Sequence, residues 1–263
     1  MLVIRLHPPY INWRVTILHF DIHVHTKEHS LDSKLPLRTI LSSAAKIGLS
    51  GVCITDHDTQ ELFPQAETLS KETGLVVIVG VEYTCMEGHL LVFGARNLRR
   101  YNATMERALN EIKSQGGIAI AAHPFRWDSP LMGDAIKKYV SLLDGIEAFN
   151  GSATTEENLR AYEFAVENEL PALGGSDAHN ETRIGRFITE FSMPIKDESD
   201  FIRAITKARS NKKSLESICA ATRQGTTYIS AYAFEKRMRE RVSPPPVNSI
   251  REVLNTPRNR FSE

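Results

Sequence analysis

The chain has 263 residues, of which 41% are hydrophobic, and it carries 32 basic and 32 acidic side chains. This length suits a single domain with one large core, and barrel domains often reach it. No apolar run approaches the roughly 20 residues that span a bilayer, and the first residues lack the apolar core of a secretory signal. The three cysteines are far apart and odd in number, which argues against a disulfide framework. We therefore exclude membrane-spanning and disulfide-stapled classes and expect a cytoplasmic protein.

The charges are unevenly distributed along the chain. Residues 207–263 hold 12 Lys and Arg against 5 Glu, a net charge of +7, so the remainder of the chain is acidic. We expect a solvated basic helix near residues 228–241 and a flexible end after Pro246; contact with nucleic acid or an acidic partner is the alternative. The predicted division is an N-terminal extension (1–18), a main domain (19–210) and a basic C-terminal helix and tail (211–263).

Apolar runs typical of buried strands alternate with segments of helical spacing. The predicted strands lie at 17–22, 51–55, 75–81, 90–93, 118–122 and 171–175, and the predicted helices at 36–48, 59–73, 102–115, 130–140 and 155–168. This alternation indicates a parallel α/β barrel, in which the C-terminal ends of the strands converge on one face. Side chains that follow different strands would then meet in one pocket.

Residues that bind metals occur beside most of these apolar runs. His23 and His25 are two residues apart, which places both imidazoles on the same side of a strand, and Asp177 and His179 repeat this spacing. Either pair alone is equally consistent with buried histidines or with a helix cap. The full set predicts a multinuclear metal site: His23, His25, Asp32, His57, Glu82, His89, His123, Asp177 and His179.

Two of these clusters carry further information. Glu82 follows a long apolar run, and a carboxylate there needs a cationic partner because unpaired burial is costly. Its two oxygens can bridge two metals. His57 lies between Asp56 and Asp58, one of which could orient a ligand from outside the metal shell, while Asp58 could also cap a turn.

Together, these motifs resemble the polymerase and histidinol phosphatase (PHP) family of metal-dependent phosphoesterases. The resemblance runs from about Phe20 to Arg209. It implies a distorted seven-stranded (β/α) barrel of the TIM-like type with two or three divalent metals at its C-terminal face. The motifs that carry it are His23-Val24-His25, Thr55-Asp56-His57, Gly80-Val81-Glu82, the Gly-His-Leu-Leu-Val-Phe-Gly run at 88–94, Ala122-His123-Pro124-Phe125-Arg126 and Ser176-Asp177-Ala178-His179.

The resemblance also implies three ligand sets. Carried over by position, His23, His25, Glu82 and Asp177 would bind the first metal, Glu82, His89 and His123 the second, and Asp32, His57 and His179 the third. The candidate catalytic residues are Glu82, Asp177 and His179. His29 competes with Asp32, because the spacing between His25 and Asp32 is about one residue longer than the family pattern.

The charge of the site bears on the substrate. Three carboxylates and six neutral imidazoles leave a net charge of about +1 with two divalent metals and about +3 with three, so an anion should be attracted. Manganese, iron and zinc all suit such a shell. A water bridging two metals would lose its proton near neutral pH and attack a phosphate ester. Arg126 and Arg183 could hold the phosphate through forked hydrogen bonds, or form ordinary surface ion pairs.

The leading hypothesis is a hydrolase of phosphate esters that acts on a small phosphorylated metabolite or a nucleotide. An exonuclease acting on nucleic-acid ends is a sharper version of it. The alternatives are an amidohydrolase-type metal hydrolase, which also begins with His-x-His but commonly uses a strand lysine as a bridge, and a non-catalytic metal-binding barrel.

Overall fold

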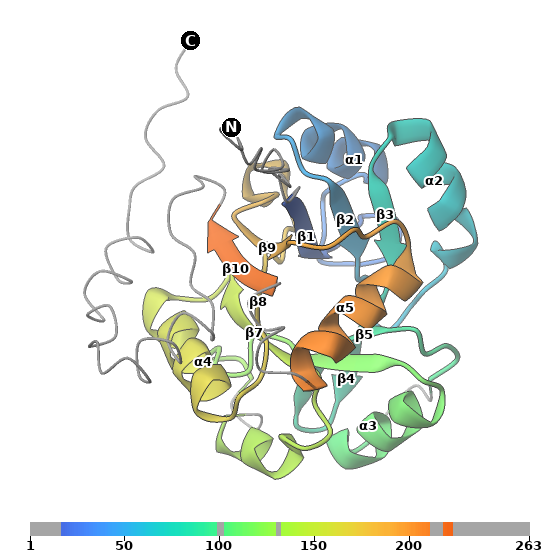
Figure 1. Cartoon of the computed structure of the whole chain (residues 1–263). Helices are drawn as coiled ribbons and strands as arrows, with labels where there is room; N and C mark the ends of the chain where they lie inside the picture. The colour runs from blue at the N-terminus through green and yellow to red at the C-terminus, as the bar shows by residue number, and fades with distance from the viewer. Residues whose placement is uncertain (1–16, 99–102, 130–132, 211–217, 223–263) are drawn as a thin grey trace, which may run out of the picture.

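The computed structural model describes residues 17–98, 103–129, 133–210 and 218–222 (Figure 1). Most of the predicted N-terminal extension lies outside these residues, as does the predicted basic helix at 228–241. The short strand β10 (Ile218–Thr222) lies within residues 211–263, the stretch predicted as helix and tail. The ten strands that the structure describes form two five-stranded sheets.

The first sheet has the order β10-β9-β1-β2-β3. Its strands β1, β2 and β3 are parallel, whereas β9 is antiparallel to both β1 and β10. The bounds are β1 (Leu18–Val24), β2 (Gly51–Ile54), β3 (Val76–Val79), β9 (Phe187–Phe191) and β10 (Ile218–Thr222).

The second sheet has the order β4-β5-β6-β7-β8. Its strands β6, β7 and β8 are parallel, whereas β5 is antiparallel to both β4 and β6. The bounds are β4 (Val81–Cys85), β5 (Gly88–Phe93), β6 (Ile118–Ala121), β7 (Gly145–Asn150) and β8 (Ala172–Gly175).

The expectation of a wholly parallel barrel is therefore wrong for part of the fold. Only Met86 and Glu87 separate β4 from β5, and a connection this short permits a hairpin but no parallel crossover. Gly80 alone separates β3 from β4, and a Cβ atom there would lie 2.5 Å from the Phe93 ring. The chain thus passes from the first sheet to the second without a helix.

Isolated bridges connect the two sheets at the ends of their strands. Val24 at the end of β1 pairs in parallel with Ala178, which follows β8. His57, which follows β2, pairs in parallel with Glu82 in β4. The described residues form a mixed α/β fold in which no closed barrel is detected. The second bridge joins two candidate ligands, and Ala178 of the first lies between Asp177 and His179.

Helices lie around the strands in Figure 1, and α5 crosses in front of them. Buried side chains of α1 and the partly buried Ala66 and Leu69 of α2 pack with β1, β2 and β3, while buried side chains of α3 and α4 pack with strands of the second sheet. Phe201, Ala204 and Ile205 of α5 pack with Phe20 and Phe93 from the two sheets, which gives the molecule a third, central core. The helix bounds are α1 (Leu37–Lys46), α2 (Ala66–Thr73), α3 (Met105–Ser114), α4 (Thr155–Glu167) and α5 (Glu198–Ser210).

The predicted helices at 36–48, 59–73, 102–115 and 155–168 correspond to α1, α2, α3 and α4. The segment predicted as a helix at 130–140 forms the 3-10 helix Asp134–Tyr139 in its described part. The sequence prediction omitted β4 beyond Val81, β7, β9, β10 and α5.

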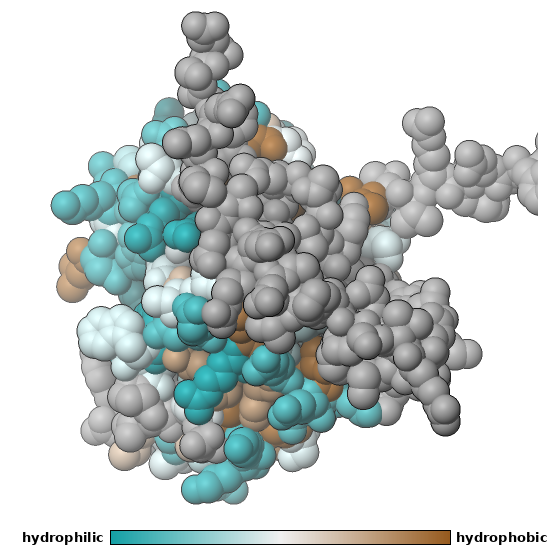
Figure 2. Space-filling model, turned by 90° about the vertical axis from the view of Figure 1, so that its left-hand side faces the viewer, coloured by the Kyte–Doolittle hydropathy of each residue, from teal (hydrophilic) through white to brown (hydrophobic). Residues whose placement is uncertain are grey.

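The visible face of the molecule in Figure 2 mixes hydrophilic and hydrophobic residues. The described part of the chain contains no helix that is both long and apolar enough to cross a bilayer. Large hydrophobic side chains are exposed at a few positions, among them Leu31 and Trp127. These two residues adjoin Asp32 and Arg126, both of which are candidate site residues.

Candidate metal centre

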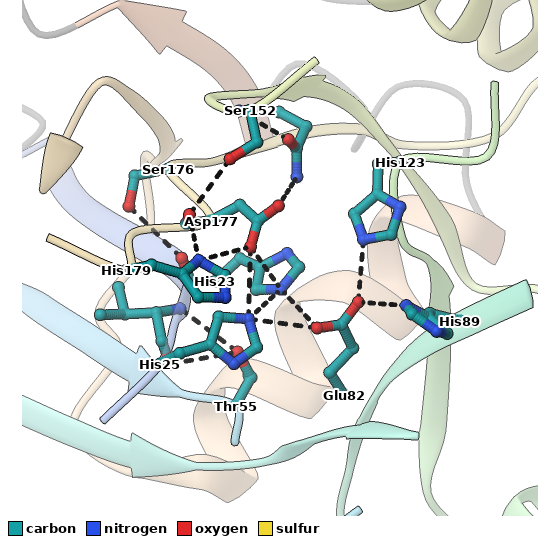
Figure 3. A network of polar contacts seen from close by, with 12 residues as sticks. His23, His25, Thr55, Glu82, His89, His123, Ser152, Ser176, Asp177 and His179 are labelled. Carbon is teal, nitrogen blue, oxygen red and sulfur yellow. Dashed lines mark hydrogen bonds and ion pairs between the residues drawn. The ribbon is translucent and has the colours of Figure 1, made fainter. Parts of the chain in front are cut away.

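The structure brings all nine predicted metal ligands together (Figure 3 labels seven of them). They come from strands of both sheets and from the loops that follow those strands. The described residues form four overlapping groups of potential ligand atoms, each group lying within 4.8 Å: His23, His25, Glu82 and Asp177; His25, His57 and His179; Glu82, His89 and His123; and His23, His123 and Glu147.

The innermost group is buried and compact. The Nε2 atoms of His23 and His25 are 2.9 Å apart, and each lies 3.1 Å from Oε2 of Glu82. Oδ1 of Asp177 lies 3.3 Å from His25 Nε2 and 3.6 Å from His23 Nε2. Ligands about 2.0–2.2 Å from a tetrahedral metal are roughly 3.3–3.6 Å apart. These two nitrogens and two oxygens therefore fit around one divalent ion with little movement.

Glu82 lies between two of the groups. Its Oε2 faces His23 and His25, whereas its Oε1 lies 2.7 Å from His89 Nδ1 and 2.8 Å from His123 Nε2. One carboxylate thus offers a separate oxygen to each group, which is the arrangement that a bridging ligand requires.

His89 reaches this point because β5 runs in the opposite direction to its neighbours. Most other candidates lie near or beyond the C-terminal ends of their strands, but Glu82 is the second residue of β4 and His89 is the second residue of β5. Because the β4–β5 hairpin pairs His89 with Thr84, the start of β5 lies at the same rim as the ends of the parallel strands.

Asp32 lies at the outer edge of the cluster. Its Oδ2 is 2.9 Å from His179 Nε2 and 3.3 Å from His57 Nε2, and its side chain is 54% exposed. His29, the competing candidate, instead places Nδ1 3.6 Å from Oε2 of Glu61. The geometry therefore favours Asp32 over His29 as the third acidic member of the cluster.

Sequence reasoning missed Glu147, which is fully buried in β7. Its Oε1 lies 2.9 Å from His23 Nδ1, and its Oε2 accepts hydrogen bonds from the backbone N–H of His123 and from Nδ2 of Asn150. The carboxylate thereby orients two candidate ligands. The sequence did contain a feature that could have identified this residue. The run Gly145–Asn150 lies between two predicted helices, where a βαβ pattern requires a strand, and Glu147 is the one acidic residue in that run.

The two candidate phosphate-binding arginines differ in their surroundings. Arg126 donates from Nη1 to Oδ2 of Asp177 at 2.6 Å and from Nε to Oδ1 of Asp128 at 2.6 Å, so it lies against the inner group. Arg183 donates from Nη1 to Oγ of Ser152 at 2.6 Å. Ser152 in turn donates to the carbonyl oxygen of Asp177 at 3.3 Å. Arg183 is thus connected to the inner group through Ser152, whereas Arg126 contacts Asp177 directly.

The backbone is strained at two of the candidate ligands. His123 has φ 30° and Asp177 has φ 49°, in a region that costs non-glycine residues on the order of 1–3 kcal/mol. Gly175 lies nearby at a point of close approach, where a Cβ atom would lie 2.6 Å both from Oε1 of Glu147 and from Cβ of His23. The fold therefore holds these side chains in positions that local preference alone would not select.

The electrostatics of the inner group indicate a need for positive charge between its members. Burial opposes ionisation, but the neighbouring His23 and hydrogen bonds from histidines hold the pKa of Glu82 well below its ordinary value, and Asp177 behaves likewise. Burial also opposes protonation of His25, but hydrogen bonds to Asp177 and Glu82 raise its pKa to about 9. A divalent ion satisfies the same two carboxylates and frees both imidazoles to bind as neutral ligands, so the donor set fits a metal.

Comparison with known proteins agrees with this geometry. Residues 21–126 match the PHP domain model, and residues 155–210 match the PHP-associated model. An uncharacterised protein of Methanocaldococcus jannaschii is 34% identical over 139 residues, which cover 49% of this chain and 80% of that protein. The chain belongs to the PHP family. The family assignment that the sequence motifs suggested is thus confirmed.

Other similar proteins share smaller parts or the fold alone. The PolC-type DNA polymerase III of Clostridium perfringens is 39% identical over 62 residues, which are 24% of this PHP protein but only 4% of the polymerase. A Bifidobacterium adolescentis protein described provisionally as a metal-dependent phosphoesterase has a TM-score of 0.55 at 20% identity, covering 72% of this chain and 96% of that one. The lesion-specific endonuclease of Pyrococcus furiosus has a TM-score of 0.57 at 19% identity, covering 93% of this chain and 74% of that one.

Proposed function

We propose that this PHP protein hydrolyses phosphate esters of a small phosphorylated metabolite or a nucleotide, in a site that holds two or three divalent ions. One observation carries the proposal: Glu82 directs Oε2 to His23 and His25 and Oε1 to His89 and His123. A single carboxylate shared between two nitrogen-rich groups is the arrangement of a multinuclear hydrolytic centre.

We propose that the centre lies in a ring of seven strands. If β3 and β4 count as one strand bent at Gly80, then β1, β2, β3/β4, β5, β6, β7 and β8 follow one another, and the Val24–Ala178 bridge brings the last beside the first. In this interpretation β9 and β10 extend the sheet beyond the ring. The main domain would then end near residue 210, with β10 contributed from the basic C-terminal stretch.

Each ion would have its own ligands on the chain. The first would be held by His23, His25, Glu82 and Asp177, the second by Glu82, His89 and His123, and the third by Asp32, His57 and His179. Divalent ions in such a centre supply Lewis acidity and activate water near neutral pH. Manganese, iron and zinc all suit this mixture of imidazole and carboxylate.

The chain's own charges would draw in an anionic substrate. Asp32, Glu82, Glu147 and Asp177 contribute four negative charges, and Arg126 contributes one positive charge. Two divalent ions would leave a net charge of about +1 and three about +3, and a positive pocket attracts phosphate groups.

The arginines and the rim residues would act on the substrate directly. Arg126 uses Nη1 and Nε for Asp177 and Asp128, which leaves Nη2 for a phosphate oxygen. Arg183, oriented by Ser152, would contact a more distant oxygen. His179 and Asp32 lie at the exposed edge. If the centre holds only two ions, His179 would be free of metal and would exchange a proton with the leaving group.

A nucleotide is favoured over a sugar phosphate by Trp127. Its side chain is 81% exposed and it directly follows Arg126, so a flat base would find a stacking partner beside the phosphate. An exonuclease acting on nucleic-acid ends would use the same surface, and the similar polymerase and endonuclease act on nucleic acids according to their names.

Activity measurements test the proposal. Protein loaded with manganese, iron or zinc should hydrolyse a chromogenic phosphate monoester, and His123→Ala should lower kcat/KM by at least about 100-fold, because even residues outside the metal shell cost 10–100-fold. His19→Ala is the matched control, since His19 pairs with Glu190 outside the site.

The substrate panel separates the alternatives. Nucleoside monophosphates, ribose 5-phosphate, short oligonucleotides and an amide substrate would be compared under the same conditions. Release of nucleotides from oligonucleotide ends would favour the exonuclease, and amide hydrolysis would favour the amidohydrolase. If protein carrying at least two ions per chain turns over none of them, the enzymatic proposal is wrong and a non-catalytic metal-binding role is left.

A further inference from the structure

Ser30 lies in the loop after β1 and touches two candidate ligands without belonging to the metal shell. Its hydroxyl donates to Oδ1 of Asp56 at 2.7 Å. The same oxygen accepts a hydrogen bond from the backbone N–H of His57 at 3.2 Å, and it lies 3.3 Å from Nδ1 of His25. Both Ser30 and Asp56 are buried, so water does not compete for these groups.

Asp56 is fixed as an acceptor by its other partners. Thr26 donates to it twice, from the backbone N–H to Oδ1 at 2.6 Å and from Oγ1 to Oδ2 at 2.8 Å. The carboxylate thus receives three hydrogen bonds, and its contact with Ser30 at 2.7 Å is the shortest of the three polar contacts that the serine oxygen makes. The proton of the Ser30 hydroxyl is therefore committed to Asp56.

The remaining capacity of Ser30 determines the tautomer of His25. A hydroxyl has one proton and two lone pairs. With the proton on Asp56 and one lone pair taken by His57 N–H, the other lone pair can meet Nδ1 of His25 only if that nitrogen carries a proton. The neutral ring then has its free lone pair on Nε2, the atom that lies 3.1 Å from Glu82 and 3.3 Å from Asp177.

We infer that Asp56 and Ser30 are positioning residues that hold His25 in the Nδ1–H tautomer and so keep Nε2 ready to bind a metal. Ser30 also ties the backbone of His57 to the ring of His25, which belongs both to the inner group and to the group with His57 and His179. One serine thus couples two ligand sets. Neither residue carries a metal itself.

This inference rests on the proposed metal centre. Zinc binding by the unchanged protein tests the metal centre, and zinc binding by the variants tests the positioning role of Ser30 and Asp56. Zinc affinity of the full chain would be measured by competition with a chromophoric chelator. Ser30→Ala should weaken zinc binding at the His25 site by about 10–100-fold, the usual cost of losing an outer hydrogen-bond partner of a metal-binding histidine. Asp56→Ala should do the same, because it frees the serine proton to turn toward His25.

Two variants serve as matched controls. Asp56→Asn can keep an amide oxygen toward Thr26 N–H and Ser30 while its amide nitrogen donates to Thr26 Oγ1, so it should retain most of the affinity. Ser33→Ala removes a hydroxyl from the same loop that donates to the backbone carbonyl oxygen of His25 at 2.8 Å and does not touch the ring. It should bind zinc within about threefold of the unchanged protein.

Nitrogen-15 NMR of the zinc-loaded protein provides a readout that a merely structural role would not change. We expect His25 to show a protonated, slowly exchanging Nδ1 and a zinc-bound Nε2, and Ser30→Ala to lose the slow exchange. Zinc bound through Nδ1 in the unchanged protein would overturn the inference even if the variants do not fold. Equal zinc affinity and equal exchange in Ser30→Ala would overturn it as well. Failure of the unchanged protein to bind zinc would instead contradict the metal centre itself.

Discussion

At the scale of single residues, several candidate ligands are held in place by side chains that do not face the proposed metal positions. Glu147 holds Nδ1 of His23 and the backbone of His123, just as Ser30 holds Nδ1 of His25. The nine metal-prone residues were predictable from the sequence because their types and spacing are chemically distinctive. Ser30 was not predicted, because a loop serine becomes informative only when its hydrogen-bond partners are known. Glu147 had a sequence signal as a lone acid in an apolar run, but its contacts with His23 and His123 appear only in the fold.

Replacement of Glu147 by glutamine should separate orientation from folding. A glutamine would keep its oxygen toward the N–H groups of His123 and Asn150 and turn its NH2 group toward Nδ1 of His23. The ring would then carry its proton on Nε2, which blocks the metal-facing nitrogen. We expect zinc affinity to fall about 10–100-fold, measured by chelator competition, with little change in the far-ultraviolet circular dichroism.

The control for this variant is Glu163→Gln, which removes a charge from the exposed face of α4. It should leave zinc binding unchanged. If Glu147→Gln binds zinc as tightly as the control does, then Glu147 does not set the orientation of His23.

At the scale of elements, α4 is tied to the loop that carries Arg126. Thr154 accepts a hydrogen bond from the backbone N–H of Glu157, and the Glu157 side chain accepts one in return from the backbone N–H of Thr154. Oε1 of the same glutamate accepts from the backbone N–H of Trp127 at 2.7 Å. The start of one helix thus fixes the position of the loop at the mouth of the site. The sequence shows the capping residues Thr154 and Glu157. It does not show that Glu157 also accepts a hydrogen bond from Trp127, which is 30 residues away.

Loss of the Thr154 hydroxyl should therefore affect stability. Thr154→Ala removes the N-cap acceptor, and we expect the free energy of unfolding to fall by about 1 kcal/mol. Urea denaturation followed by circular dichroism measures this difference. Thr154→Ser, which keeps the hydroxyl, should stay close to the unchanged protein; an equal loss in both variants would contradict the capping explanation.

At the scale of the whole molecule, the proposed metal centre joins the two sheets. Its ligands come from β1 in one sheet and from β4 and β5 in the other, together with loops from both. Removal of the ions would leave buried carboxylates and imidazoles to be neutralised by protons. Stability should then depend on pH in a way that metal abolishes.

Metal-free protein should lose stability between about pH 6.5 and 9. Burial opposes protonation of His25, but its hydrogen bonds to Asp177 and Glu82 raise its pKa from 6.5 to about 9 on folding. Protonation of His25 therefore stabilises the folded state. This stabilisation is complete below pH 6.5 and disappears as the pH rises through 9. For one such group the loss is about 3 kcal/mol at most.

The carboxylates act in the opposite direction. The pKa values of Glu82 and Asp177 are lowered on folding, from 4.5 and 3.8, so their contribution is present above about pH 4.5 and is lost as the pH falls. Thermal unfolding of chelator-treated and zinc-loaded protein across pH 4–9 provides the test. Zinc replaces the protons on the ligand side chains and should keep Tm high at pH 9. An equal fall of Tm in the chelator-treated and the zinc-loaded protein would show that the candidate ligands do not cause the pH dependence.

The sequence by itself determined the family, the α/β class, most of the strands and helices that precede the site, and the identity of nine candidate ligands. These features depend on local periodicity and on side-chain chemistry, which a chain carries in its order of residues. The tertiary structure decided the rest: the reversal of β5 that brings His89 to the rim, the placement of Asp32 rather than His29 beside His57 and His179, and the contacts of Glu147 and Ser30. Those depend on which distant groups meet and on how each hydrogen-bond donor and acceptor is satisfied, and only the packed fold fixes both.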